Sequence, residues 1–265
     1  MPQTIDKQAV ADSFSKAACH YDQFAQLQRD IGEILLGQLS KPSKPKLSLN
    51  NLVDLGCGTG YFSEKLNIQF PSASLTCFDL SPVMLEQAKK RNLAQVTFQQ
   101  GDIDSLPFAK DSIDLIYSNL VVQWSDNLGA CLKQLHSSLK IGGRCYLSTL
   151  ISGTLNELTQ AWKSVDDKPH TNTFLSLKDL ELIIENCAFS NVNITTQTRV
   201  LKYKNVVEVM RALKGIGANH VHGHQVSSIS GRQLVKQLEA GYQPFINQQG
   251  LCNLTYQVCY IEVIK

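Results

Sequence analysis

The sequence predicts an α/β fold: a doubly wound, mostly parallel sheet with helices on both faces. Three observations favour it. Short apolar runs alternate with helical patterns, a glycine-rich turn follows the first run, and Asp79 ends the second. We interpret residues 52–55, 75–78, 96–98, 115–117 and 145–150 as strands, separated by helices around 60–69, 82–92 and 126–139. In such sheets the ligand lies at the carboxyl ends of the strands.

The segments on either side of this alternation are predicted as follows. Residues 11–39 have helical spacing, with Asp12 expected to cap the start, and the proline- and lysine-containing segment 40–46 is a linker. The glycine-containing segment 140–144 is expected to be a turn into the fifth strand. After residue 150 the patterns predict helices at 155–162, 176–188, 205–214 and 231–242, and strands at 192–200 and 254–263.

Composition narrows the class of protein. The 265 residues carry a formal net charge of +2, too small by itself to indicate a nucleic-acid partner. The eight cysteines form no C-x-x-C pair and lie mostly in apolar runs, which is typical of reduced, buried thiols. No stretch is long and apolar enough to span a membrane, so we expect a cytoplasmic protein with no membrane partner.

The first predicted strand is followed by a glycine loop, Gly56-Cys57-Gly58-Thr59-Gly60, preceded by Asp54. Glycines let the backbone approach a ligand, and the loop amides are expected to point at a carboxylate or phosphate. The dinucleotide motif spaces its last glycine one residue further along, where Tyr61 stands here. The spacing therefore favours an aminoacyl nucleoside over a pyrophosphate.

Further strand ends carry residues suited to such a ligand. Asp79 is placed to accept the ribose hydroxyls, and Asp102 with Ile103 to hold the adenine. Asn119 and Leu120 follow the fourth strand, beneath the methionine part. The remaining expected cofactor contacts are Leu80 and Met84. Taken singly, the glycines could form a plain turn and Asp79 could cap the helix after Ser81-Pro82, but together the residues favour a site.

Residues 51–150 resemble class I methyltransferases. The resemblance implies S-adenosylmethionine as cofactor, S-adenosylhomocysteine as product, and a seven-stranded sheet whose last strand is antiparallel. It requires no metal, and we interpret the segment containing His220, His222 and His224 as a polar loop. Segment 118–124 lacks the motifs of nucleic-acid base methyltransferases, so a nucleic-acid substrate is disfavoured.

Stretches spread along almost the whole chain are similar to the malonyl-acyl-carrier-protein O-methyltransferases of biotin synthesis. They are 14–18 with 21–22, 118–124, 148–150 with 153–155 and 160–162, 213–219, and 254–256. The resemblance implies methylation of the free carboxylate of a malonyl thioester, carried on the phosphopantetheine of acyl-carrier protein or on coenzyme A. The neutral ester then passes as a substrate of fatty-acid elongation. A monomer is expected.

Three residues are predicted to serve catalysis. Arg211 matches an arginine of the family and is predicted to hold the acceptor carboxylate; the alternative is a surface pair with Glu208. Tyr21 is predicted to close over the methyl group, or else to pack on its helix. Trp124, with Gln123, is predicted to line the acceptor channel, although a tryptophan there is often simply part of the core.

The order of the predicted helices and strands also suggests a division of the chain. Residues 1–46 are lid helices and linker, 47–150 the cofactor-binding core, and 151–265 complete the sheet with insertions at 151–175 and 204–250 that form the acceptor lid. Basic residues of the second insertion could attract an acidic carrier protein or be plain solvated surface: Lys202, Lys204, Lys214, Arg232 and Lys236. Two alternatives stay open: methylation of a small free di- or tricarboxylic acid of the trans-aconitate type, and a non-catalytic protein that binds S-adenosylmethionine.

Overall fold

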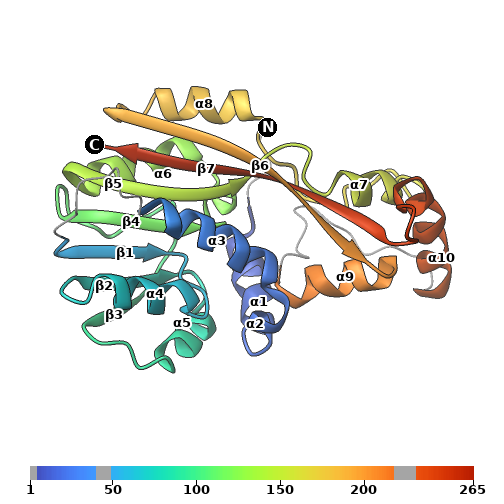
Figure 1. Cartoon of the computed structure of the whole chain (residues 1–265), viewed down its shortest axis with the longest axis horizontal. Helices are drawn as coiled ribbons and strands as arrows, with labels where there is room; N and C mark the ends of the chain where they lie inside the picture. The colour runs from blue at the N-terminus through green and yellow to red at the C-terminus, as the bar shows by residue number, and fades with distance from the viewer. Residues whose placement is uncertain (1–4, 40–48, 218–230) are drawn as a thin grey trace.

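A computed structural model describes residues 5–39, 49–217 and 231–265 of the chain. It contains one seven-stranded sheet of order β3-β2-β1-β4-β5-β7-β6 (Figure 1). The pairs among β1 to β5 are parallel, whereas β7 is antiparallel to both of its neighbours, which confirms the predicted fold class. The strands are β1 (Asn51–Leu55), β2 (Ser74–Asp79), β3 (Val96–Gln100), β4 (Ile113–Asn119), β5 (Leu139–Leu150), β6 (Asn191–Tyr203) and β7 (Cys252–Ile264).

Two apolar layers form because successive strand residues point to opposite faces of the sheet. Leu52 packs in one layer, with side chains of α3 (Gln26–Leu39), α4 (Tyr61–Gln69) and α5 (Pro82–Lys89). The adjacent Val53 packs in the other, with α6 (Leu128–Ser138) and α8 (Leu177–Glu185). Seven of the eight cysteines are buried and all eight are free thiols.

The N-terminal region differs from the single helical pattern read from the sequence. It forms three helices, α1 (Lys7–Ala17), α2 (Tyr21–Phe24) and α3. The predicted cap at Asp12 is wrong: Asp6 begins the first helix, because its carboxylate accepts a hydrogen bond of 2.9 Å from the backbone N–H of Ala9. The helix therefore starts a turn earlier than the apolar pattern suggests.

The predicted turn at 140–144 is also wrong. These residues belong to β5, which begins at Leu139. The register with β4 shifts here, since Ile113 pairs with Leu139 and Leu115 pairs with Arg144. The extra residues, with Gly142 at φ +76°, are accommodated as an irregularity inside the strand rather than as a separate turn.

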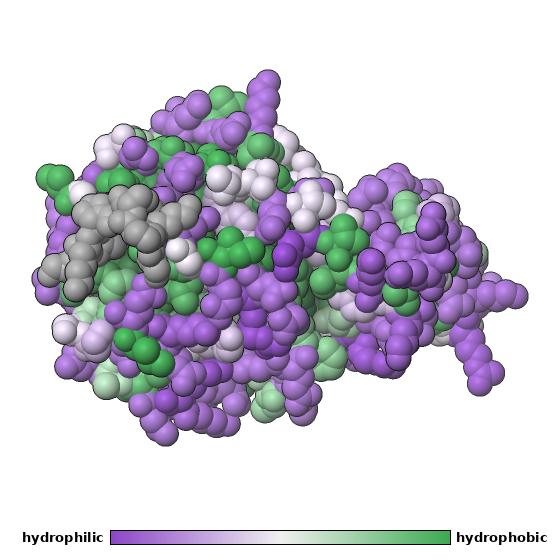
Figure 2. Space-filling model, in the orientation of Figure 1, coloured by the Kyte–Doolittle hydropathy of each residue, from purple (hydrophilic) through white to green (hydrophobic). Residues whose placement is uncertain are grey.

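The hairpin of β6 and β7 is longer than its partner strand. The two strands pair from Asn191 opposite Ile264 to Tyr203 opposite Cys252, while β5 leaves β7 at Leu150 opposite Val258. Its free end carries α7 (Asn156–Trp162), α9 (Val206–Gly215) and α10 (Gly231–Tyr242), seen as a smaller lobe in Figures 1 and 2. None of the helices described here is long and apolar enough to cross a membrane.

Candidate cofactor and acceptor site

The glycine loop after β1 needs glycine for two different reasons. Gly56, Gly58 and Gly60 all have positive φ, at 74°, 53° and 79°. A Cβ on Gly56 would lie 2.2 Å from Cγ2 of Val121, so only glycine fits there. A Cβ on Gly58 would meet no protein atom within 4 Å, which leaves space for a ligand beside this backbone. Gly60 lies at the N-cap of α4, where a Cβ would lie 2.9 Å from Ala88.

The amides of this loop do not point at a ligand as the sequence led us to expect. The N–H groups of Gly56 and Cys57 donate to the carbonyl of Phe78, and Gly60 donates to the carbonyl of Cys57. The N–H of Gly58 donates to Oδ2 of Asp79 at 2.8 Å. The loop therefore supplies shape rather than free amides at these positions, and it holds the carboxylate that ends β2.

Asp79 is placed to accept further hydrogen bonds. Its Oδ1 accepts from the N–H of Ser81 at 2.8 Å, and the backbone N–H of Leu80 also faces the carboxylate, which still leaves lone pairs for further donors. Burial raises the pKa of Asp79 to about 6, although the backbone donors favour the ionised form. Two acceptor oxygens side by side match the two hydroxyls of a ribose.

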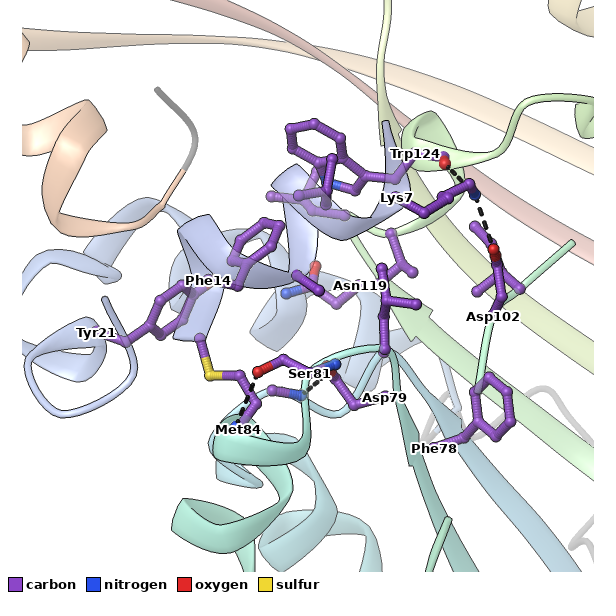
Figure 3. Close-up of a pocket in the computed structure, with 18 residues that line it drawn as sticks. Lys7, Phe14, Tyr21, Phe78, Asp79, Ser81, Met84, Asp102, Asn119 and Trp124 are labelled. Atoms are coloured by element: carbon purple, nitrogen blue, oxygen red, sulfur yellow. Dashed lines mark hydrogen bonds and ion pairs between the residues drawn. The ribbon is translucent and has the colours of Figure 1, made fainter. Parts of the chain in front are cut away.

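The carboxylate after β3 is held from the N-terminal helix. Nζ of Lys7 lies 3.1 Å from Oδ1 of Asp102 and 2.6 Å from Oδ2 of Asp104, and it donates to the carbonyl of Trp124 at 2.7 Å (Figure 3). Burial alone would lower the pKa of Lys7, but the hydrogen bonds to both carboxylates outweigh it and raise the pKa. Among the described residues Oδ2 of Asp102 has no hydrogen-bond partner, and Ile103 beside it is buried.

Asn119 acts through other protein groups. Its Nδ2 donates to the backbone carbonyl of Gln28 at 2.9 Å and its Oδ1 accepts from Ser148 at 2.7 Å. The side chain thus joins α3 to the ends of β4 and β5. Asp54 is likewise occupied, since Ser63 donates to its Oδ2 at 2.6 Å, and burial raises the pKa of Asp54 to about 7.

Three neighbouring cavities meet at the N-terminal helices. The strand-end cavity is lined by Lys7, Val10, Ala11, Phe14, Tyr21, Gly56, Gly58, Phe78, Asp79, Leu80, Ser81, Met84, Asp102, Ile103, Asn119, Leu120, Val121 and Trp124. The glycine-loop cavity lies between α3 and the loop and is lined by Tyr21, Gln28, Arg29, Asp54 and Gly56 to Thr59, among others. The wide cavity, about 840 Å³, runs from Tyr21 toward α8 and α9. Tyr21 lines all three, so this tyrosine marks their junction. Figure 3 shows Tyr21 among the residues that line the strand-end cavity.

The wide cavity is apolar near this junction. Phe14 and Trp124 pack edge to face there, with ring centroids 5.5 Å apart, and Leu27, Leu213 and Ile216 line the same cavity. Among its described lining residues there is no lysine or arginine. Burial, with Asp79 and Asp22 nearby, raises the pKa of Tyr21 well above its usual value, so its hydroxyl is a neutral donor.

The predicted site residues are therefore only partly brought together. Tyr21 and Trp124 line the junction, and the predicted cofactor residues line the strand-end or glycine-loop cavity, except Gly60. Arg211 lines none of the three cavities and is exposed on α9, whose buried residues Val206, Val209 and Leu213 occupy the opposite face. Its role toward a carboxylate stays a prediction. The histidines at 220, 222 and 224 and the linker at 40–46 fall outside the described residues.

Contacts of the N-terminal helices were missed from the sequence. Phe14 lies over Gly217, where a Cβ would come within 3.1 Å of its Cα, and Phe24 lies over Gly215. The two glycines of the Lys-Gly-Ile-Gly run thus allow α1 and α2 to approach the end of α9. The glycine spacing was a visible signal, but its partner could not be read from it.

The fold and the site together define a class I methyltransferase. A strand-end cavity beside a glycine loop, with paired acceptor oxygens at Asp79, fits the adenosyl part of S-adenosylmethionine. Residues 53–147 match the family model described as a methyltransferase domain. The YcgJ protein of Bacillus subtilis superposes with a TM-score of 0.60 over 88% of this chain and 98% of its own, at 18% identity, and so shares the fold.

Sequence comparison identifies the family. The chain is 40% identical to the malonyl-[acyl-carrier protein] O-methyltransferase of Serratia marcescens, over 97% of this chain and 95% of that protein. It is 34% identical to the biotin biosynthesis bifunctional protein BioHC of Cellvibrio japonicus, over 98% of this chain and 51% of that protein. The chain belongs to the malonyl-[acyl-carrier protein] O-methyltransferase family.

Proposed function

We propose that this protein transfers the methyl group of S-adenosylmethionine to the free carboxylate of a malonyl thioester on acyl-carrier protein, as a step of biotin synthesis. The observation that carries the proposal is the junction at Tyr21, where the two cavities suited to the cofactor meet a third that is large enough for an acyl chain on its carrier arm. The names of the relatives point to the same substrate.

The site needs no general base. A carboxylate is ionised at neutral pH and is already the nucleophile, and the cofactor supplies an electrophilic methyl on a sulfonium. The chain's own contribution is alignment and exclusion of water. Phe14 and Trp124 would exclude water at the junction, and the protonated hydroxyl of Tyr21 would orient the carboxylate.

The apolar character of the junction favours this reaction. An anion and a cation both lose charge as the new bond forms, so a site of low polarity destabilises the separated charges more than the transition state. Neutral donors then suit the carboxylate better than a tight guanidinium pair, which would hold the negative charge on it. The absence of lysine and arginine among the described lining residues agrees with that requirement.

Docking of the carrier protein would fall on the small lobe. Lys202, Lys204, Arg211 and Lys214 are exposed on β6, α9 and the segment between them, and Arg232 and Lys236 are exposed on α10. An acidic carrier would be attracted to this group, and the effect would weaken with salt. The lysines and Arg232 would accelerate encounter without touching the reacting carboxylate, and substitution of Arg211 tests whether it does the same or holds the carboxylate. The expected monomer stays a prediction, which sedimentation would check.

The direct test is a labelled methyl assay. The protein is incubated with labelled S-adenosylmethionine and either malonyl-acyl-carrier protein, malonyl-coenzyme A, or free di- and tricarboxylates. We expect base-labile methyl ester on the carrier protein, with less on coenzyme A. Label found only on a free acid, or none on either malonyl thioester, would refute the assignment.

A further inference from the structure

The glycine-loop cavity has features that the adenosine contacts do not explain. It lies between the loop and α3, and α3 contributes two consecutive residues to its lining, Gln28 and Arg29. The other lining residues include Asp54 and Asn119, whose side chains already have protein partners. A ligand group that enters this cavity would therefore meet α3 on one side and the loop on the other.

An anion in this cavity would find few donors in the loop. The N–H groups of Gly56, Cys57, Gly58 and Gly60 all have acceptors within the protein. The cation in the lining is Arg29, because Arg91, which stands near the same Tyr61 ring, does not line the cavity. A carboxylate placed there would thus be neutralised by Arg29.

The guanidinium of Arg29 is held in place yet not used up. Its Nη1 donates to the carbonyl of Asp22, its Nη2 donates to Oε1 of Gln26 at 3.0 Å, and its Cζ stands 5.8 Å from the centre of the Tyr61 ring. A guanidinium has five N–H donors in a planar fork, more than these contacts require. Because the Asp22 carbonyl and the Gln26 side-chain oxygen are both neutral, they do not compensate the positive charge of Arg29.

Gln28 offers the complementary group. Its side-chain oxygen Oε1 is buried and has no hydrogen-bond partner among the described residues. A buried acceptor without a partner is costly, and a ligand donor would remove that cost. The backbone of Gln28 is fixed by Asn119, whose Nδ2 donates to its carbonyl, so the side chain projects from a defined position.

We propose that Gln28 and Arg29 bind the amino-acid end of the cofactor, with Arg29 taking the α-carboxylate and Oε1 of Gln28 taking the α-ammonium group. The carboxylate would then meet a cation and the ammonium group a neutral acceptor across one small cavity, whose lining also includes Asp54. This rests on the proposed function for the identity of the cofactor only. Because both residues lie on α3, the cofactor would connect the glycine loop to the N-terminal helices.

Ligand truncation separates this role from general stability. Calorimetry compares S-adenosylhomocysteine, which has the amino-acid end, with 5′-methylthioadenosine, which lacks it. Arg29→Met should weaken binding of the first about tenfold or more and leave the second within about twofold. The matched control is Arg199→Met, which removes a guanidinium paired with Asp30 of the same helix at 2.9 Å and lines no cavity described above. Equal weakening of both ligands by Arg29→Met would overturn the proposal.

The role of Gln28 is tested by introducing a negative charge at this position. An added carboxylate accepts from an ammonium group but repels an anion, so Gln28→Glu should keep the affinity for S-adenosylhomocysteine while Gln28→Leu lowers it severalfold. An analogue that lacks the α-amino group but keeps the carboxylate should bind the Gln28→Leu protein as it binds the wild type, and should bind the Gln28→Glu protein more weakly because the two carboxylates repel each other. Both variants could instead keep the wild-type affinity for the cofactor and raise only the KM for the malonyl thioester. In that case Gln28 serves the acceptor and our assignment is wrong.

These outcomes are independent of the acceptor. A wild-type protein that binds S-adenosylhomocysteine but methylates no malonyl thioester would refute the proposed function and leave the inference standing. The protein could instead methylate the thioester while substitutions of Gln28 and Arg29 weaken S-adenosylhomocysteine no more than 5′-methylthioadenosine. That result would support the proposed function and refute the inference. Arg29→Lys provides a second variant if Arg29→Met unfolds, and partial recovery of the difference between the two ligands is expected from it.

Discussion

Protonation of Asp79 should control cofactor affinity. The ribose hydroxyls need an ionised carboxylate to accept both of their hydrogen bonds, and burial raises the pKa of Asp79 to about 6 in the protein without cofactor. Below that pH the carboxyl of the free protein is mostly protonated, and the protein must release this proton when the cofactor binds. Affinity for S-adenosylhomocysteine is therefore expected to fall as pH falls through 6.

The magnitude follows from the titration of one group. At pH 5, one unit below a pKa of about 6, roughly a tenth of Asp79 is ionised, so the dissociation constant should rise about tenfold, or about 1.4 kcal/mol. At pH 7 most of the group is ionised and the constant should be near its limit. Calorimetry between pH 5 and 8 measures this profile, and buffers of different ionisation enthalpy report the released proton.

A substitution identifies the group responsible. Asp79→Asn should weaken binding at pH 7 and remove the step near pH 6. Asp54→Asn serves as the comparison, because the pKa of Asp54 is raised by burial to about 7 and its loss should leave the lower step in place. A step near pH 6 that survives Asp79→Asn would refute this reasoning.

Other substitutions test separate parts of the site. If Arg211 docks the carrier, Arg211→Ala should raise the KM for malonyl-acyl-carrier protein severalfold at low salt and leave the KM for malonyl-coenzyme A unchanged. An equal loss of kcat with both substrates would instead show that Arg211 holds the acceptor carboxylate. Gly217→Ala introduces a Cβ at φ +70°, 3.1 Å from Cα of Phe14, and should lower the unfolding free energy by about 1–2 kcal/mol and reduce turnover, as measured by denaturation and assay. Lys7→Met leaves the carboxylates of Asp102 and Asp104 without their shared cation and should speed release of S-adenosylhomocysteine in stopped flow; an unchanged rate would show that this contact does not retain the cofactor.

The alternation of parallel strands and helices was predictable from the hydrophobic pattern, and the seven strands with an antiparallel last strand were implied by the family resemblance. The first and last residues of the helices and strands were harder to predict. The pattern gave no reason to prefer Asp6 to Asp12 as a cap, since both precede helical residues and the choice depends on which N–H the carboxylate reaches. The β5 register shift depends on pairing with β4, a contact between distant segments.

The strand-end residues of the site were predictable because the fold itself brings them to one edge of the sheet. Most of the residues that the N-terminal helices contribute to the site could not be predicted. Lys7, Gln28 and Arg29 carry no motif, and their relevance follows from how α1 and α3 lie over the loops. Arg211 was predicted from its match to an arginine of the family, whereas the burial of the other face of α9 decides where its side chain goes.

The N-terminal helices are tied to each loop that the cofactor would contact. Lys7 binds the carboxylates after β3, the Ser15 and Ser81 hydroxyls are 2.8 Å apart after β2, and Asp22 accepts from Thr59 at 2.7 Å in the glycine loop. The same helices contact the end of α9 through Phe14 and Phe24. A cofactor held beneath them therefore helps to fix the surface that Phe14 and Tyr21 present to the wide cavity. Binding of S-adenosylhomocysteine and of the malonyl thioester should consequently be coupled, each raising the affinity for the other by the same factor, and calorimetry with and without the partner ligand would measure it.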